Sequence, residues 1–218
     1  MSAVTGPFSS TRRMVLAGAV VLLLAVGLVA LMVGRPSSAS SSARAAQSAA
    51  AEGSADAGFA RDMAIHHQQA VEMSFIVRDR TEDEDVRRLA YDIINTQANQ
   101  RGMMLGWLEQ WGLPKSSAEP PMTWMGHTMK PTGDGSLMPG MATTAELKEL
   151  KAAEGRAAEV LFLRLMTVHH RAGVDMARAG AEKAGTDVIR NLAKGMVNGQ
   201  ESEIGLMATM LKARGAQP

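Results

Sequence analysis

Two short segments of the chain combine histidine and methionine in the same order. "MAIHHQQAVEM" runs from Met63 to Met73, and "MTVHHRAGVDM" runs from Met166 to Met176. In each segment one methionine stands three residues before a pair of adjacent histidines, and another stands six residues after it. Imidazole nitrogen and thioether sulfur both bind borderline or soft metals, so the pattern predicts a metal site. The candidate ligands are Met63, His66, His67, Met73, Met166, His169, His170 and Met176.

The donor types indicate which metal such a site would hold. Thioether and imidazole without thiolate favour Cu(I), or the chemically similar Ag(I). The chain has no cysteine, which excludes disulfides and thiolate sites. A ferritin-like di-iron site needs glutamate three residues before the histidine, where this chain has Met63 and Met166. Since ligation needs neutral imidazole, we expect histidine-dependent affinity to fall below about pH 6.5, and contacts through methionine alone to resist acid.

The same residues have an alternative interpretation as core residues. Methionine at helical spacing often only fills a core, and a buried histidine is often only hydrogen-bonded. Duplication of the whole pattern favours ligation by at least one histidine pair. Adjacent residues of a helix point roughly 100° apart, so neither pair is expected to chelate one ion alone. One ring would face the core and its neighbour the next helix or solvent, or each would join ligands from another helix.

A third group of soft donors lies between the two segments, in "PMTWMGHTMKPTGDGSLMPGM" from Pro121 to Met141. Glycine, proline and threonine make this stretch a poor helix, so we predict a loop. One interpretation is a loop that captures soft metal ions. The alternatives are a lid that covers the end of the helices with apolar side chains, or a sink for oxidants. The donors of this loop are Met122, Met125, His127, Met129, Met138 and Met141.

An internal duplication indicates the elements that position these residues. Shifted by 103 residues, the stretch 59–112 aligns with 162–215 without a gap. Each copy shows two runs of helical periodicity separated by a short turn. The sequence therefore predicts an all-α, antiparallel four-helix bundle over residues 54–215. It would consist of a first hairpin at 54–112, the methionine-rich loop at 113–142 and a second hairpin at 143–215.

Local signals predict where the helices begin and end. Thr81 with Glu84, and Thr143 with Glu146, have the spacing of capping boxes, and the helical pattern runs on from Thr143 to the second histidine pair. Folding each hairpin about its turn places Gln97 level with His66, and likewise Gln200 level with His169. We therefore expect these two glutamines to orient the histidine rings.

The N-terminal segment predicts export. Arg12 and Arg13 precede an uncharged, mostly apolar run from Met14 to Val33, which is long enough to cross a bilayer. Residues 1–34 are thus an uncleaved membrane anchor or a removable signal peptide, and both place the remainder outside the cytoplasm. Residues 35–53 are rich in serine and alanine and are interpreted as a tether.

Composition and charge narrow the function classes. Hydrophobic residues make up 46% of the 218-residue chain, enough for a packed core. The formal net charge is +1 and no basic stripe appears, so nucleic-acid binding is not expected. We find no nucleophile–base set or carboxylate pair with convincing placement, so an enzyme is not expected either. A homo-oligomer and a metal-transfer partner both remain open.

The duplicated M-x-x-H-H-x-x-x-x-x-M segments resemble the domain-of-unknown-function 305 family, which includes CopM-like copper-binding proteins. The "MPGM" before the second hairpin is similar to sequences of that family. The resemblance covers about Asp56 to Gly215 and implies an exported or membrane-tethered, ferritin-like bundle that binds copper or silver through the eight methionines and histidines given above. The family commonly has a Gln-x-x-Glu segment on the second helix. Gln200 and Glu203 keep it, whereas Gln97 is followed by Gln100.

These observations lead to two functional hypotheses. The first is a non-enzymatic, extracytoplasmic protein that sequesters or hands over Cu(I), or Ag(I). The second is a structural or interaction module of the cell envelope, in which the histidines are polar anchors of the core and bind no metal.

Overall fold

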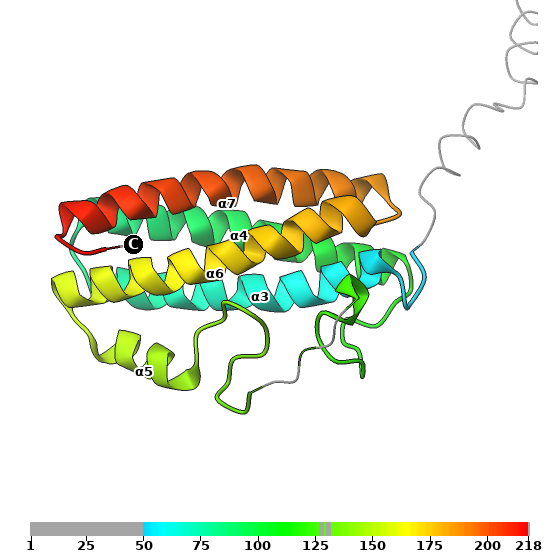
Figure 1. Ribbon diagram of the computed structural model, residues 1–218, viewed down its shortest axis with the longest axis horizontal. Coiled ribbons are helices and arrows are strands. Elements are labelled where there is room, and N and C mark those ends of the chain that lie inside the picture. Colours follow the sequence, from blue (N-terminus) through cyan, green and yellow to red (C-terminus); the bar gives the residue numbers. More distant parts are fainter. Residues whose placement is uncertain (1–49, 127–128, 130–131, 218) are drawn as a thin grey trace, which may run out of the picture. The chain divides into compact units, whose positions relative to one another are not determined.

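The described part of the chain is all-helical. The computed structural model describes residues 50–126, 129 and 132–217, and no strand occurs among them. Figure 1 shows four long helices lying side by side, together with a short helix and a 3-10 turn on one side. The elements are α3 (Ala55–Arg78), α4 (Glu84–Gln110), the 3-10 turn η1 (Thr123–Met125), α5 (Thr144–Ala152), α6 (Gly155–Lys183) and α7 (Asp187–Ala213).

The long helices pack as two hairpins. Helix α3 packs along α4, α6 packs along α7, and the hairpins meet mainly through α3 and α6. The loop and α5 lie on the α3 and α6 side (Figure 1). Gly180 of α6 allows a close approach of the two hairpins, because a Cβ atom there would lie 2.6 Å from the buried Phe59 ring of α3. The helices that contain the two histidine pairs are therefore direct neighbours.

Side-chain caps begin most of the helices, and one predicted cap is wrong. Thr143 and Glu146 form the predicted capping box at the start of α5. The Thr81–Glu84 box does not form, because Asp83 caps α4 by accepting a hydrogen bond from the Val86 amide. The Thr81 hydroxyl instead donates to Glu159, a partner from the other hairpin. A tertiary contact therefore replaces the local one.

The second hairpin contains a break that the helical pattern does not predict. We expected the helix from Thr143 to run on to the second histidine pair, but α5 ends at Ala152 and α6 begins at Gly155. Ala153 is extended, and Gly155 has a φ of 53°, which favours glycine. The Gly155 amide donates to the Arg80 carbonyl. This contact with the first hairpin stabilises the break and turns α5 back along α3.

The core forms two apolar clusters at opposite ends of the long helices. One contains Phe59, Met63 and Met176, and the other contains Met73, Phe162 and Met166. Along both α3 and α6 the histidine pair lies between residues of the first cluster and residues of the second. We call His66, His67, His169 and His170 the histidine layer. Polar rings thus separate the two apolar clusters.

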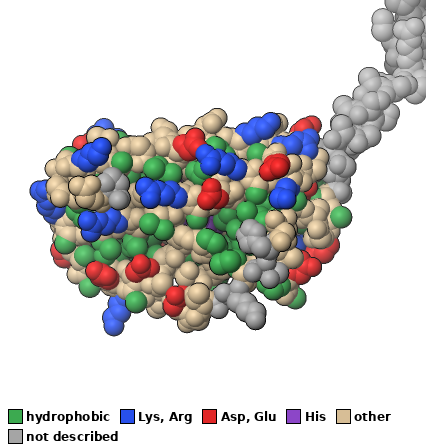
Figure 2. Space-filling model, in the orientation of Figure 1, with side chains coloured by type: hydrophobic (Ala, Val, Ile, Leu, Met, Phe, Trp, Pro, Cys, Tyr) green, Lys and Arg blue, Asp and Glu red, His purple; other side chains and the backbone are tan. Residues whose placement is uncertain are grey.

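The sequence predicts an N-terminal segment that can cross a membrane and a surface without a basic stripe. In the described part of the chain, none of the helices combines the length and the apolar character needed to span a bilayer. The expected anchor or signal peptide, and most of the tether, lie outside the described residues. Figure 2 shows basic and acidic side chains interspersed over the face in view, with apolar side chains between them.

Candidate metal site

The four histidines of the two repeats come together inside the protein. The rings of His66 and His169 stack with their centroids 3.7 Å apart and their planes inclined by 30°. The centroids of His169 and His170 are 6.2 Å apart. None of the four side chains is more than 1% exposed. The first histidine of each pair therefore faces its counterpart across the α3–α6 contact, and neither pair points to solvent.

In three of these rings, Nε2 forms a hydrogen bond. His67 Nε2 lies 2.8 Å from Gln100 Oε1 on α4, and His170 Nε2 lies 2.6 Å from Glu203 Oε2 on α7. His169 Nε2 lies 3.1 Å from the His66 carbonyl oxygen. A backbone carbonyl and a carboxylate only accept, so His169 and His170 donate from Nε2 and carry a lone pair on Nδ1 when neutral, whereas the amide of Gln100 can accept from or donate to His67. The second histidine of each pair is thus held by the second helix of its own hairpin.

The glutamines expected to orient the rings do not do so. Gln97 and Gln200 are buried as predicted, but neither hydrogen-bonds a histidine within the described chain. The partners are Gln100 and Glu203, one helical turn further along. Counting residues back from the turn cannot fix which helical turn faces the ring, because the crossing of the two helices decides it. In the Gln-x-x-Glu segment of the second hairpin, the residue that contacts the histidine is the glutamate and not the glutamine.

The histidine layer contains buried nitrogen atoms without partners. Among the described residues, no group has hydrogen-bonding geometry to Nδ1 of any of the four rings or to Nε2 of His66, although the Pro139 backbone lies close enough to His66 to raise its pKa. A buried polar atom without a partner costs roughly 1–3 kcal/mol, so each one needs an explanation. Each neutral ring has one nitrogen with a lone pair, so the layer contains nitrogen donors that could bind a further group.

Burial keeps three of these imidazoles in the neutral form that binds metals. Loss of hydration, with smaller contributions from the nearby His67 and His170, lowers the pKa of His66 to about 3, and the Pro139 backbone opposes this shift. Burial also lowers the pKa of His67 to about 4, and the hydrogen bond between His67 and Gln100 Oε1 opposes this shift. The pKa of His169 falls well below 6.5 for the same first reason. His66, His67 and His169 are therefore neutral near pH 6.5 in the metal-free protein, and the pH dependence of metal affinity stays a prediction.

The four repeat methionines flank the histidine layer symmetrically. Met63 and Met176 belong to one apolar cluster, and Met73 and Met166 belong to the other. Each side of the layer thus has one thioether from α3 and one from α6, and all four methionines are buried. The arrangement places soft sulfur donors on both sides of the imidazoles, from both repeats.

The donors do not form a ready coordination sphere. Within the described chain, no group of three or more His, Asp or Glu side chains is arranged to hold a metal ion. Because ring lone pairs lie in the ring plane, the stacked His66 and His169 rings cannot both point at an ion between them. Binding at the layer would require these rings to turn.

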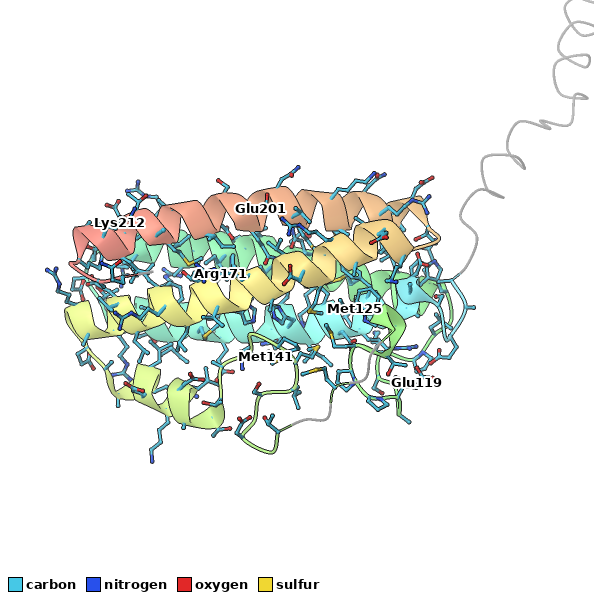
Figure 3. All side chains as sticks on the ribbon, in the orientation of Figure 1. Glu119, Met125, Met141, Arg171, Glu201 and Lys212 are labelled. Atoms are coloured by element: carbon cyan, nitrogen blue, oxygen red, sulfur yellow. The ribbon has the colours of Figure 1, made fainter. Side chains whose placement is uncertain are left out.

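The methionine-rich loop packs on the helices beside the layer. Met122 and Met138 are buried in the first cluster, and Met125, Met129 and Met141 are partly buried against it. Figure 3 shows Met125 and Met141 where the loop lies along α3. This packing agrees with the lid interpretation, although the loop covers the side of the helices. Metal capture by the loop stays a prediction, and His127 lies outside the described residues.

Side chains of α3 hold the loop at both of its ends. Asp62 accepts hydrogen bonds from the Met122 amide and from Trp124 Nε1, at 2.8 and 2.9 Å. Burial raises the pKa of the Asp62 carboxyl, and these two hydrogen bonds oppose the rise. Gln69 forms two hydrogen bonds with the Ala142 backbone, at 2.8 and 2.7 Å.

The end of the loop covers the histidine layer directly. We call Met138–Ala142 the strap. A Cβ atom on Gly140 would lie 2.5 Å from the Ala172 side chain and 3.3 Å from His169 Cα, so only glycine fits this close crossing. The Pro139 backbone lies beside the His66 ring. A pocket of about 480 Å³, lined in part by Gln69 and Met141, adjoins the strap. The pocket therefore lies next to the segment that crosses the histidine layer.

Comparison with known protein families identifies the chain. The sequence profile of the "Domain of unknown function (DUF305)" family matches residues 56–211. The chain belongs to the DUF305 family. The resemblance inferred from the histidine and methionine segments is therefore confirmed.

Solved structures of DUF305 proteins are similar over most of the chain. A Streptomyces coelicolor protein that is thought to be secreted is 63% identical, with a TM-score of 0.71, over 77% of this chain and 98% of that one. A Deinococcus radiodurans fragment is 30% identical, with a TM-score of 0.62, over 73% and 96%. CopM in its Cu(I)-bound form is 23% identical, with a TM-score of 0.56, over 72% and 96%, which shows a shared fold. Comparison with curated proteins gave no match.

Proposed function

We propose that this DUF305 protein is an extracytoplasmic, non-enzymatic protein that binds Cu(I), or Ag(I), for sequestration or transfer. Four buried Nδ1 atoms without hydrogen-bond partners among the described residues are the observation that carries the proposal. They lie in one layer, at the centre of a helical architecture that we interpret as a ferritin-like four-helix bundle. The histidines of this layer would supply nitrogen, and Met63, Met73, Met166 and Met176 would supply sulfur.

The chemistry of the donors supports a soft, monovalent ion. Neutral imidazole and thioether carry no charge, so a divalent cation in this dry interior would lack compensation, whereas Cu(I) needs less. Glu203 is the acidic group in direct contact with the layer, through His170. CopM, which shares the fold, was crystallised with Cu(I), Cu(II) and Ag. The loop methionines would deliver the ion across the strap.

Export supports the same function. The related Streptomyces coelicolor protein is thought to be secreted. The apolar run from Met14 to Val33 would serve as the membrane anchor or as the export signal. A protein outside the cytoplasm meets metal ions before they enter the cell, which suits sequestration or transfer.

A second candidate function is an envelope structural or interaction module. The hydrogen bond from His169 to the His66 carbonyl joins α6 to α3, as a polar anchor of the core would. The lack of a prearranged three-ligand group in the described chain also favours it. Under this alternative the protein would bind no metal, and the histidines would affect stability alone.

Replacing the four repeat methionines by leucine tests the role of sulfur. We expect M63L/M73L/M166L/M176L to stay folded, because each exchange nearly conserves volume and costs less than about 1.5 kcal/mol. Its affinity for Cu(I) should fall by at least about tenfold, or about 1.4 kcal/mol of binding free energy. Zn(II) affinity should change less, because Zn(II) gains little from thioethers. Anaerobic competition against a Cu(I) chelator measures this.

The control for that experiment is the single variant M103L, since Met103 is 40% exposed on α4. It should bind Cu(I) as the wild type does. Unchanged Cu(I) affinity in the fourfold variant would remove the methionines from the site.

A further inference from the structure

The two halves of the histidine layer are built alike but held by different groups. His67 on α3 contacts Gln100 on α4, and His170 on α6 contacts Glu203 on α7. Each contact joins residues 33 positions apart in its own hairpin. The two contacts are thus equivalent under the internal duplication. The only chemical difference is an amide oxygen in one half and a carboxylate oxygen in the other.

This difference affects the protonation of the rings. A carboxylate can only accept a hydrogen bond, so Glu203 requires a proton on Nε2 of His170 and leaves a lone pair on Nδ1 of the neutral ring. An amide can accept through oxygen or donate through nitrogen. Gln100 can therefore pair with either neutral form of His67, and in one of these the proton occupies Nδ1. His170 is fixed as a metal donor, whereas His67 is not.

The difference also affects donor strength. A carboxylate that accepts from the far nitrogen of an imidazole raises the basicity of the ring towards a metal. The Glu203 side chain is 23% exposed and the His170 side chain is fully buried. Because Glu203 Oε2 lies 2.6 Å from His170 Nε2, little water separates the two groups. The carboxylate also brings negative charge close to a bound cation, in an interior where charge is poorly screened.

We propose that Glu203 is the positioning residue that makes the His170 half of the layer the high-affinity half. Gln100 leaves the His67 half weaker and easier to exchange. The first ion therefore binds with His170, and the second is the one more readily transferred. This inference rests on the proposed function and adds an order of filling to it. Outer ligand partners of this kind are worth about 10–100-fold in metal affinity.

Three variants of the full-length protein test this inference: E203Q, Q100E and the exchange variant Q100E/E203Q. The exchange variant has the composition and net charge of the wild type, so it is a matched control for the loss of a carboxylate. Anaerobic chelator competition gives the stepwise Cu(I) affinities. Long-range ¹H–¹⁵N NMR of the histidine rings reports which nitrogen carries the proton and which ring responds first to the ion.

We expect E203Q to weaken the first binding step by about 10–100-fold and to release His170 from its single protonated form. Q100E should strengthen the second step. In the exchange variant the first-step affinity should return, with His67 now responding before His170. Unchanged binding in E203Q, or His170 still responding first in the exchange variant, would overturn the inference.

The NMR measurement separates this inference from the proposed function. A wild-type protein that retains no Cu(I) would contradict the proposed function. The metal-free protein would still report on Glu203, because its carboxylate should fix the proton on Nε2 of His170 without any metal. An unchanged ring in metal-free E203Q would therefore contradict the positioning role by itself.

Discussion

Replacing the whole histidine layer is expected to abolish high-affinity Cu(I) binding. In H66Q/H67Q/H169Q/H170Q the affinity should fall by more than about 100-fold. Loss of an outer partner alone costs about 10–100-fold, and here the nitrogen donors themselves are removed. Glutamine approximates the size of the ring and offers an amide, but it has no nitrogen lone pair for Cu(I). Anaerobic titration against a competing Cu(I) chelator measures the change.

A single variant of the methionine-rich loop provides the comparison. H127Q removes the fifth histidine of the chain and should retain Cu(I) within about tenfold of the wild type. Circular dichroism and thermal unfolding must show that the fourfold variant is folded. If it does not fold, the double variant H67Q/H170Q serves instead, with a smaller expected loss. A folded variant with an altered melting temperature and unchanged copper uptake would favour the structural module.

The metal-free protein is expected to lose much of its stability in mild acid. In the unfolded chain these histidines titrate near pH 6.5, while burial lowers the pKa of folded His66 to about 3 and of His67 to about 4. The pKa of His169 is lowered well below 6.5 as well. Between these values the unfolded chain binds protons that the folded chain does not, so the free energy of unfolding falls as the pH falls.

The size of this effect follows from the number of protons. Each of these three histidines contributes at most about 1.4 kcal/mol per pH unit over this range. The stabilisation is complete above about pH 6.5 and is lost progressively as the pH falls, down to about pH 4 for His67 and about pH 3 for His66. From pH 7 to pH 5 the total is a large fraction of the roughly 5–15 kcal/mol of a typical domain.

Urea unfolding of the metal-free protein at pH 7, 6 and 5 measures this loss. The fourfold glutamine variant, if folded, should show a much flatter dependence, because the titrating rings are gone. The single variant H67Q should fall between the two. Equal pH dependence in wild type and fourfold variant would mean that the layer is accessible to protons in the folded state.

Most of the helical architecture could be predicted from local signals. The Thr143–Glu146 cap forms as predicted, and α4 ends at Gln110, close to the predicted end of the first hairpin at residue 112. The wrong predictions involve residues whose partners are distant in sequence. Thr81 pairs with Glu159, and the Gly155 amide pairs with the Arg80 carbonyl. Local spacing contains no information about such partners, so the expected cap and the continuous helix were both wrong.

In the candidate site, too, the sequence predicts some features, whereas others depend on partners that are distant in the sequence. The residue types and the 103-residue shift predict that His66 and His169 occupy equivalent positions, and their rings stack. Helical periodicity also places Gln97 and Gln200 in the interior. The ring partners Gln100 and Glu203 depend on how each pair of helices crosses, which the sequence does not specify. Burial likewise lowers the pKa values of His66 and His67 below the ordinary value near 6.5 that is expected from residue type alone.

The most direct test of a copper site at the histidine layer is an anaerobic Cu(I) titration of the purified protein, ended by X-ray absorption at saturation. We expect retention against a competing chelator, and a first shell of both nitrogen and sulfur. That shell should lose its nitrogen in the folded fourfold glutamine variant. A first shell of sulfur alone, unchanged by removal of the four histidines, would contradict the account and would assign any bound copper to methionines outside the layer.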